Sequence, residues 1–322
     1  MANQSINPMK NILFLVVFLA NIQFGTAQYT EIINSKRPGF SESPYGVGTN
    51  VYQVETGMFF NSSNDESLGA KAKTLGGELF FRVGKFKERL EFNANVAYQR
   101  DEVNNFPNPN YHIKGISNLT VGAKYLIYQQ EFKDKSKEIR SWKRKMAFDK
   151  KRLIPSVGVY GGANLNFLGK DYKSDEGISY KGAVLLQNDF SDRLVLLTNL
   201  IADNITSEDK YYSYIVTMTY AINQNWSYFV ENQGKYYNDF SPNYQFGTGI
   251  AYLVTENLQL DASARTNFLD DYSYLYATAG LSWRLDRHQD SFVYKNAPKE
   301  NISKKTPNKK GFFSRLFKKK RN

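Results

Sequence analysis

Apolar and polar residues alternate in short segments between residues 51 and 285 of the chain. Apolar residues occupy every second position from Leu90 to Tyr98, and polar residues occupy most of the positions between them. Successive side chains of a β-strand point to opposite faces, so this pattern predicts a strand with one apolar and one polar face. The pattern predicts twelve such strands, at residues 51–60, 74–83, 89–99, 115–127, 153–167, 181–190, 193–202, 212–220, 225–234, 243–253, 257–267 and 273–285.

The connections between these strands favour a membrane barrel over a soluble β protein. Outer-membrane barrels of bacteria have an even number of strands, short periplasmic turns and longer external loops. If the N-terminus is periplasmic, the predicted connections at 84–88, 191–192, 221–224 and 254–256 are short and periplasmic. The external ones are polar and mostly longer, at 61–73, 100–114, 168–180, 203–211, 235–242 and 268–272. The expected fold is all-β, a transmembrane antiparallel up-and-down β-barrel of about twelve strands.

One periplasmic connection, residues 128–152, is long and basic and does not follow this rule. Trp142, Met146 and Phe148 would line one side of a short helix there. Two interpretations stay open for this connection, a solvated helical cap or a periplasmic lid or docking element.

The sequence divides into four regions. In residues 1–27, Lys10 precedes an apolar run too short to span a bilayer, and small residues follow, which predicts a cleaved secretory signal peptide rather than a buried helix. Residues 28–50 contain two prolines and three glycines, which argue against a central strand, so we expect a plug in the pore or a periplasmic segment. Residues 51–286 form the expected outer-membrane barrel. Residues 287–322 form a basic tail that we expect to be periplasmic and disordered.

Composition and charge agree with this division. Aromatic residues make up 15% of the chain, as two aromatic girdles at the membrane interfaces would require. The net charge is +11, but residues 287–322 carry 12 Lys or Arg against two Asp or Glu, and residues 131–152 carry ten against four. The basic charge thus belongs to two appendages, and the remaining body is mildly acidic, so no nucleic-acid partner is expected.

Charged residues within the alternating segments are expected to face the lumen. A charge on the lipid face near the midplane would cost up to about 2–4 kcal/mol, most for Arg or Lys. The inward set is Glu55, Glu78, Arg82, Glu91, Lys124, Glu231, Asp261, Arg265 and Arg284. A network among the first five would be structural, satisfying buried charges, or would form a selectivity constriction. Residues 194–197 are apolar on both faces, so the phase of the strands at 181–190 and 193–202 stays open.

Catalytic and metal-binding patterns are scarce. The two histidines, His112 and His288, are predicted at opposite ends of the barrel, which separates the members of any Ser/His/Asp triad or two-histidine metal site. There is no cysteine, and no glycine-rich phosphate loop lies between a strand and a helix. We therefore expect no catalytic residues, metal or cofactor, and an outer-membrane phospholipase or protease is a weaker alternative.

Residues 37–44, Arg-Pro-Gly-Phe-Ser-Glu-Ser-Pro, followed by Val-Tyr-Gln-Val-Glu-Thr-Gly at 51–57, resemble the opening of the phenol-degradation meta-pathway outer-membrane proteins. Further similarities, at residues 119–125 and 280–286, are common to barrel strands in general. The resemblance covers residues 35–286, and the basic tail departs from it. It implies an outer-membrane transporter, in the company of channels for hydrophobic small molecules. It also implies lumen or plug positions for Arg37, Glu42, Gln53 and Glu55.

These observations together predict an outer-membrane barrel that passively transports a small solute through a narrow lumen, which residues 28–50 are candidates to plug. Hydrophobic and aromatic solutes are the candidates, and the expected partners are the solute and outer-membrane lipid. The alternative is a closed structural or tethering barrel that binds a periplasmic partner through the basic tail and the connection at 128–152.

Overall fold

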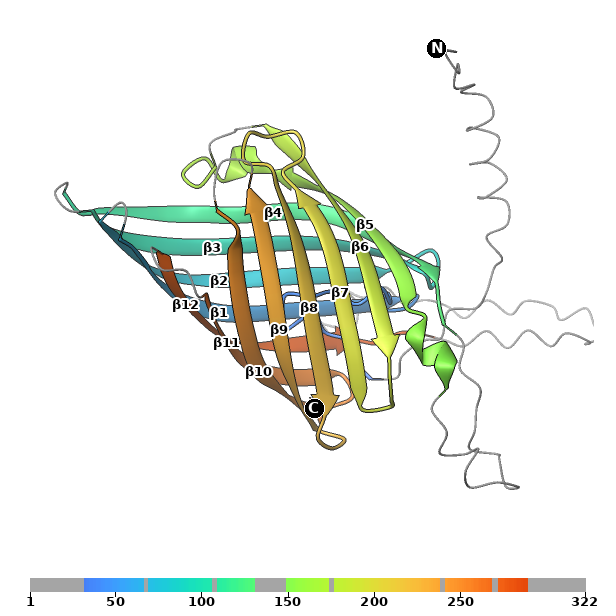
Figure 1. Cartoon of the computed structure of the whole chain (residues 1–322). Helices are drawn as coiled ribbons and strands as arrows, with labels where there is room; N and C mark the ends of the chain where they lie inside the picture. The colour runs from blue at the N-terminus through green and yellow to red at the C-terminus, as the bar shows by residue number, and fades with distance from the viewer. Residues whose placement is uncertain are drawn as a thin grey trace, which may run out of the picture. The chain divides into compact units, whose positions relative to one another are not determined.

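The computed structural model describes residues 32–66, 69–105, 109–130, 149–173, 177–237, 241–267 and 272–288. Its strands close into one antiparallel barrel, in which each strand pairs with its neighbours in sequence and β1 pairs with β12 (Figure 1). The strands are β1 (Val51–Asp65), β2 (Ala70–Gly84), β3 (Leu90–Asn105), β4 (Tyr111–Tyr128), β5 (Ser156–Leu165), β6 (Ile178–Asp189), β7 (Leu194–Asp203), β8 (Tyr211–Ala221), β9 (Trp226–Tyr237), β10 (Asn243–Thr255), β11 (Leu258–Asn267) and β12 (Tyr272–Leu285). The predicted up-and-down barrel and all twelve of its strands are confirmed.

The expected contrast between short and long connections is only partly correct. Predicted loops 61–73 and 100–114 are mostly strand, because β1 continues to Asp65, β2 begins at Ala70, β3 continues to Asn105 and β4 begins at Tyr111. Polar residues there extend the sheet, since strand pairing satisfies their backbone groups whatever their side chains face. The connection between β4 and β5 is long, as expected, and it contains the 3₁₀ turn η1 (Lys150–Leu153).

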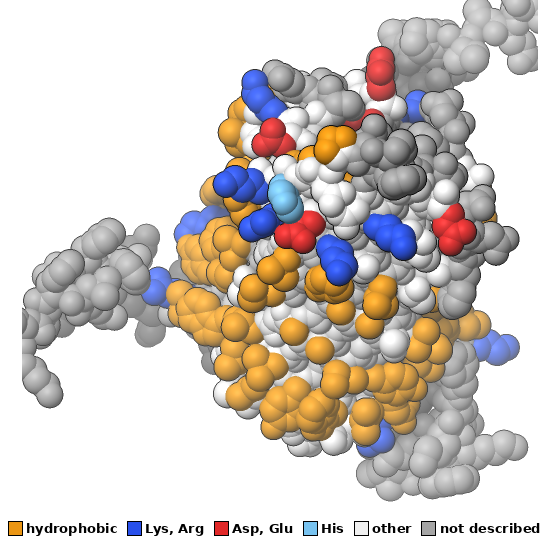
Figure 2. All heavy atoms as spheres, turned by 90° about the vertical axis from the view of Figure 1, so that its left-hand side faces the viewer, with side chains coloured by type: hydrophobic (Ala, Val, Ile, Leu, Met, Phe, Trp, Pro, Cys, Tyr) orange, Lys and Arg blue, Asp and Glu red, His pale blue; other side chains and the backbone are white. Residues whose placement is uncertain are grey.

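The outer face of the barrel is apolar over its middle and aromatic toward both ends. Exposed aliphatic side chains on the strands include Met58, Leu79, Val121, Leu200, Val230, Ile250 and Leu281. Exposed aromatic side chains nearer the strand ends include Tyr111, Tyr180, Tyr212 and Tyr244 at one end, and Tyr128, Tyr220, Trp226 and Trp283 at the other. Figure 2 shows hydrophobic side chains gathered over the lower part of one face and charged side chains over the upper part. This is the surface that a barrel needs in a bilayer.

The phase of β6 and β7, which the sequence left open, is set by the structure. Asn199 on β7 is 1% exposed and lies inside the barrel, whereas its neighbour Leu200 is 51% exposed and points outward. On β6, Leu185 is buried and Val184 is exposed. The odd-numbered residues of both strands therefore face the lumen.

Three predictions lie outside the described residues. These are the signal peptide at 1–27, the helix expected around Trp142 and Met146, and the tail beyond residue 288. The tethering alternative depends on the last two and stays a prediction. No helix within the described ranges has the length and apolar character needed to cross a membrane.

Candidate functional site

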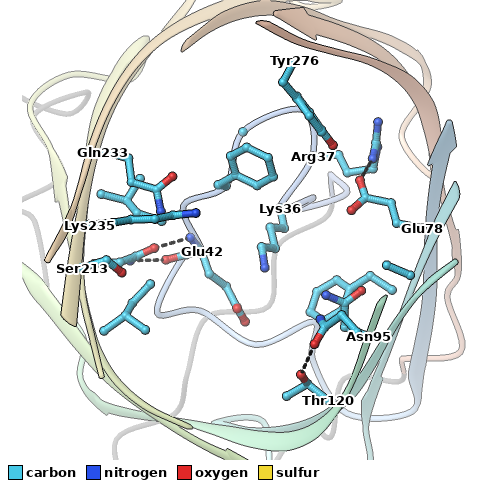
Figure 3. A pocket seen from close by; sticks show the side chains of 18 of the residues that line it. Lys36, Arg37, Glu42, Glu78, Asn95, Thr120, Ser213, Gln233, Lys235 and Tyr276 are labelled. Atoms are coloured by element: carbon cyan, nitrogen blue, oxygen red, sulfur yellow. Dashed lines mark hydrogen bonds and ion pairs between the residues drawn. The ribbon is translucent and has the colours of Figure 1, made fainter. Parts of the chain in front are cut away.

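Residues 32–50, here called the N-terminal segment, enter and leave the barrel at the same end. The Ile33 N–H donates to the Glu256 carbonyl in the turn between β10 and β11, at 2.9 Å. The Asn50 N–H donates to the Gly84 carbonyl at the end of β2, at 2.8 Å. Between these points the segment contacts inward-facing side chains of most strands, and Figure 3 shows it as a ring within the wall.

The course of the segment follows the wall against the order of the strands. Its contacts run from Arg37 with Asp261 on β11, to Ser41 with Glu231 on β9, Glu42 with Asn199 on β7, Ser43 with Gln187 on β6, Tyr45 with Ser156 on β5 and Val47 with Glu91 on β3. The segment forms no strand, so its backbone N–H groups need partners from the wall.

Carboxylates and one amide of the wall accept six of these N–H groups. The pairs are Lys36 and Arg37 with Glu55 (3.0 and 3.2 Å), Phe40 and Ser41 with Glu231 (3.0 and 3.2 Å), Glu42 with Asn199 (2.6 Å) and Val47 with Glu91 (3.0 Å). Hydrogen bonds to ionised acceptors are stronger than neutral ones. The inward carboxylates therefore hold the segment's backbone as well as balancing lumen cations.

Arg37 makes the most side-chain contacts in the segment. Its guanidinium donates to Asp261 at 3.1 Å and to Thr278 at 2.8 Å, and it forms an ion pair with Glu78. It lies against Gly57 of β1 and Gly280 of β12, which face each other in the sheet. A methyl group at either glycine would overlap the guanidinium, so the missing side chains create the space that Arg37 occupies.

A second cluster joins four of the residues that the sequence predicted as a network. Arg82 forms ion pairs with Glu55 at 3.0 Å and Glu91 at 2.9 Å, and Lys124 lies 3.4 Å from Glu91. All four side chains are at most 1% exposed. The fifth, Glu78, instead pairs with Arg37.

Glu42 joins the segment to this cluster. Its carboxylate lies 3.1 Å from the Lys124 ammonium. Burial by itself would raise the pKa of Glu42, but Lys124, Lys36 and Arg82 together lower it to about 2. Glu42 is therefore ionised at neutral pH, and its ion pair with Lys124 is lost only as the pH falls toward 2.

Two of the remaining predicted lumen residues, Arg265 and Gln53, contact the N-terminal segment. Arg265 forms an ion pair with Glu231 and lies 3.6 Å from the centre of the Phe40 ring, a cation–π contact. Gln53 donates to the Asn34 carbonyl at 3.0 Å.

Arg284 lies apart from the other predicted lumen residues, at the end of β12. It donates to Asn257 at 2.7 Å and lies 3.7 Å from Asp286. Arg284 therefore belongs neither to the contacts around Arg37 nor to the ion-pair cluster around Arg82.

The segment borders a cavity of about 480 Å³ inside the barrel. Residues 36–42 contribute five lining residues, and the wall contributes polar, aromatic and aliphatic side chains (Figure 3). Among them are Asn95, Thr120, Tyr160, Lys181, Ser213, Ile215, Gln233, Lys235 and Tyr276. The volume lies in the range typical of small-molecule sites.

Several of these residues were not predicted as site residues. Asn199 and Lys181 lie on β7 and β6, whose phase the sequence did not fix. Lys235 was placed in a predicted loop, because β9 continues beyond its expected end to Tyr237. The alternation in β9 does place Lys235 on the same face as Glu231, and this signal could have found it.

The arrangement offers little to catalysis. His112 lies 4.0 Å from Glu102 near the hairpin that joins β3 and β4, and His288 contacts the Thr49 carbonyl beyond β12. Within the described residues, no group of three or more His, Asp or Glu is placed to hold a metal ion.

Among solved structures, an outer membrane channel from Pseudomonas putida F1 has a similar fold, with a TM-score of 0.54 and 10% sequence identity. The similarity covers 78% of this chain and 100% of that one. The translocator domain of the autotransporter NalP from Neisseria meningitidis gives a TM-score of 0.45 at 10% identity, covering 74% of this chain and 89% of that one. No curated protein matches the sequence.

Residues 35–285 match the family described as "Putative MetA-pathway of phenol degradation". The match spans the whole barrel, Val51 to Leu285, together with most of the N-terminal segment. This confirms the resemblance carried by residues 37–44 and 51–57. The chain therefore belongs to this family and is an outer-membrane β-barrel of the porin-like kind.

Proposed function

We propose that this barrel passively conducts a small solute across the outer membrane, and that the N-terminal segment acts as a plug that narrows its lumen. The observation that carries the proposal is the cavity of about 480 Å³, bordered by the segment on one side and by inward residues of the wall on the others. A barrel of twelve strands is wider than the eight-stranded barrels that side chains fill, and narrower than an open porin.

The lining indicates the kind of solute. Amides, hydroxyls and charged groups lie beside Phe40, Phe59, Phe80 and Tyr276. Pockets that bind small molecules commonly combine apolar surface with a few placed polar groups. An aromatic solute with a polar substituent would use both kinds of surface.

The test is transport by the purified protein in liposomes and planar bilayers. We expect small aromatic solutes to enter liposomes that contain the protein, and discrete conductance steps to appear in bilayers. A variant that lacks residues 32–50 should conduct more, because the lumen would lose the residues that border the cavity. If neither the full chain nor the shortened chain supports conductance or uptake while both are folded, the proposal is wrong.

A further inference from the structure

The side chains that line the cavity carry more positive than negative charge once their ion pairs are taken into account. Each of the three carboxylates that line the cavity has a cationic partner, and one of the lining lysines has an anionic partner. The pairs are Glu42 with Lys124 (3.1 Å), Glu55 with Arg82 (3.0 Å), Glu78 with Arg37 and Lys181 with Asp203 (2.8 Å). No lining carboxylate is left to neutralise a further cation.

Two lysines that line the cavity, Lys36 and Lys235, have no ion pair with any described residue. The Lys36 ammonium lies 5.1 Å from the centre of the Phe80 ring, and its positive field contributes to the low pKa of Glu42. Figure 3 shows both side chains directed into the cavity, Lys36 from the segment and Lys235 from β9. An ammonium group in a partly enclosed site is stabilised by an anion, because desolvation penalises an unpaired charge.

One wall of the same cavity is aromatic. The Tyr276 ring stacks on Phe59 with centroids 5.5 Å apart and tilts against Phe40 at 5.6 Å. Tyr276 on β12 contacts both Phe59 on β1 and Phe40 in the segment, so the three rings form one continuous aromatic surface. Such a surface can pack a flat aromatic ring in a stacked or edge-to-face arrangement.

We propose that the cavity binds small aromatic carboxylates. Lys36 and Lys235 attract the carboxylate, and the rings of Phe40, Phe59 and Tyr276 pack the apolar part. This inference rests on the proposed function, since it names the class of solute that the lumen selects. It favours an organic anion over a neutral hydrocarbon, which would leave both ammonium groups without a partner.

The test is direct binding to the full-length protein in detergent at pH 7, measured by calorimetry with three probes of similar size. These probes are benzoate, benzyl alcohol and benzylammonium. We expect benzoate to bind about tenfold more tightly than benzyl alcohol, and benzylammonium to bind least. The double variant Lys36→Met and Lys235→Met should lose this advantage and bind benzoate no better than the alcohol.

Two control variants separate loss of charge from loss of structure. Lys114→Met removes an exposed lysine of β4 that does not line the cavity, and it should keep the affinity for benzoate within about twofold. Lys235→Arg keeps the charge and should retain the preference for benzoate. Heat-modifiable migration in gels establishes that each variant is folded.

The inference is wrong if the three probes bind equally, if none binds, or if the folded double variant binds benzoate as tightly as the parent. Transport is read separately in liposomes. Binding of benzoate without uptake of any solute would contradict the proposed function alone. Uptake without preference for benzoate over benzyl alcohol, together with equal binding, would contradict this inference alone.

Discussion

At the scale of single residues, Arg37 is held by partners that are far from it in sequence. Asp261 and Thr278 follow it by more than 220 positions, yet both bond its guanidinium. The motif at residues 37–44 indicated that Arg37 matters, but nothing in it named these partners. They depend on the register between β11, β12 and β1, which forms only in the closed barrel.

Gly57→Ala should loosen the segment, because the added methyl group would displace the Arg37 guanidinium from its position between Gly57 and Gly280. Arg37 would then lose its contacts with Asp261 and Glu78. We expect a higher conductance in bilayers and a loss of about 1–3 kcal/mol in the free energy of unfolding, the usual cost of breaking buried charged hydrogen bonds.

Gly161→Ala is the matched control for this prediction. Gly161 is also a strand residue, but a methyl group there has nothing within 4 Å. Its conductance and stability should equal those of the parent protein. Unchanged conductance in Gly57→Ala would show that Arg37 does not restrict the pore.

At the scale of elements, alternation predicted the presence of the strands well and the bounds of several strands poorly. A period of two is a local property, so all twelve strands could be found, and so could the inward position of Glu91 or Arg265. The ends of strands such as β1 and β9 are polar and depend on pairing with a neighbour, which alternation does not report. The path of residues 32–50 could not be predicted either, because prolines show only that the segment is not a strand.

A disulfide between segment and wall would test whether the segment must move. The Oγ atoms of Ser35 and Ser282 are 2.7 Å apart, and the chain has no cysteine of its own. In the variant Ser35→Cys and Ser282→Cys, oxidation would fix one end of the segment to β12, while β1 holds the other. We expect oxidation to suppress conductance and a reductant to restore it.

The single variant Ser35→Cys should be insensitive to both reagents. Full conductance in the oxidised double variant, with the cross-link verified by mass spectrometry, would mean that solutes pass a stationary segment.

At the scale of the whole molecule, the barrel separates two environments along every strand. On β9, Val230 is 47% exposed on the outer face while Glu231 is 1% exposed in the lumen. This separation lets the protein keep charged clusters inside without placing charge against lipid. The mean hydropathy of the chain is −0.53, and the inward polar residues lower it, so a low value is compatible with a membrane barrel.

Val230→Arg and Val254→Arg should differ in cost, because lipid penalises charge most at the midplane. Val230 lies in the middle region of β9, whereas Val254 lies beyond Tyr252, which packs against Trp226 near the end of the barrel. We expect Val230→Arg to lose about 2–4 kcal/mol and Val254→Arg about 0–1 kcal/mol. Urea unfolding in phospholipid vesicles measures both, and equal costs would contradict the assignment of β9 as a membrane-spanning strand.

The long-range contacts of Arg37 also constrain biogenesis. The earliest part of the described chain can complete its bonds only after the last two strands, β11 and β12, have been added and the cylinder has closed on β1. The docking of Arg37 is thus a late step of assembly, and an intermediate that lacks β11 and β12 would leave its guanidinium without Asp261 and Thr278.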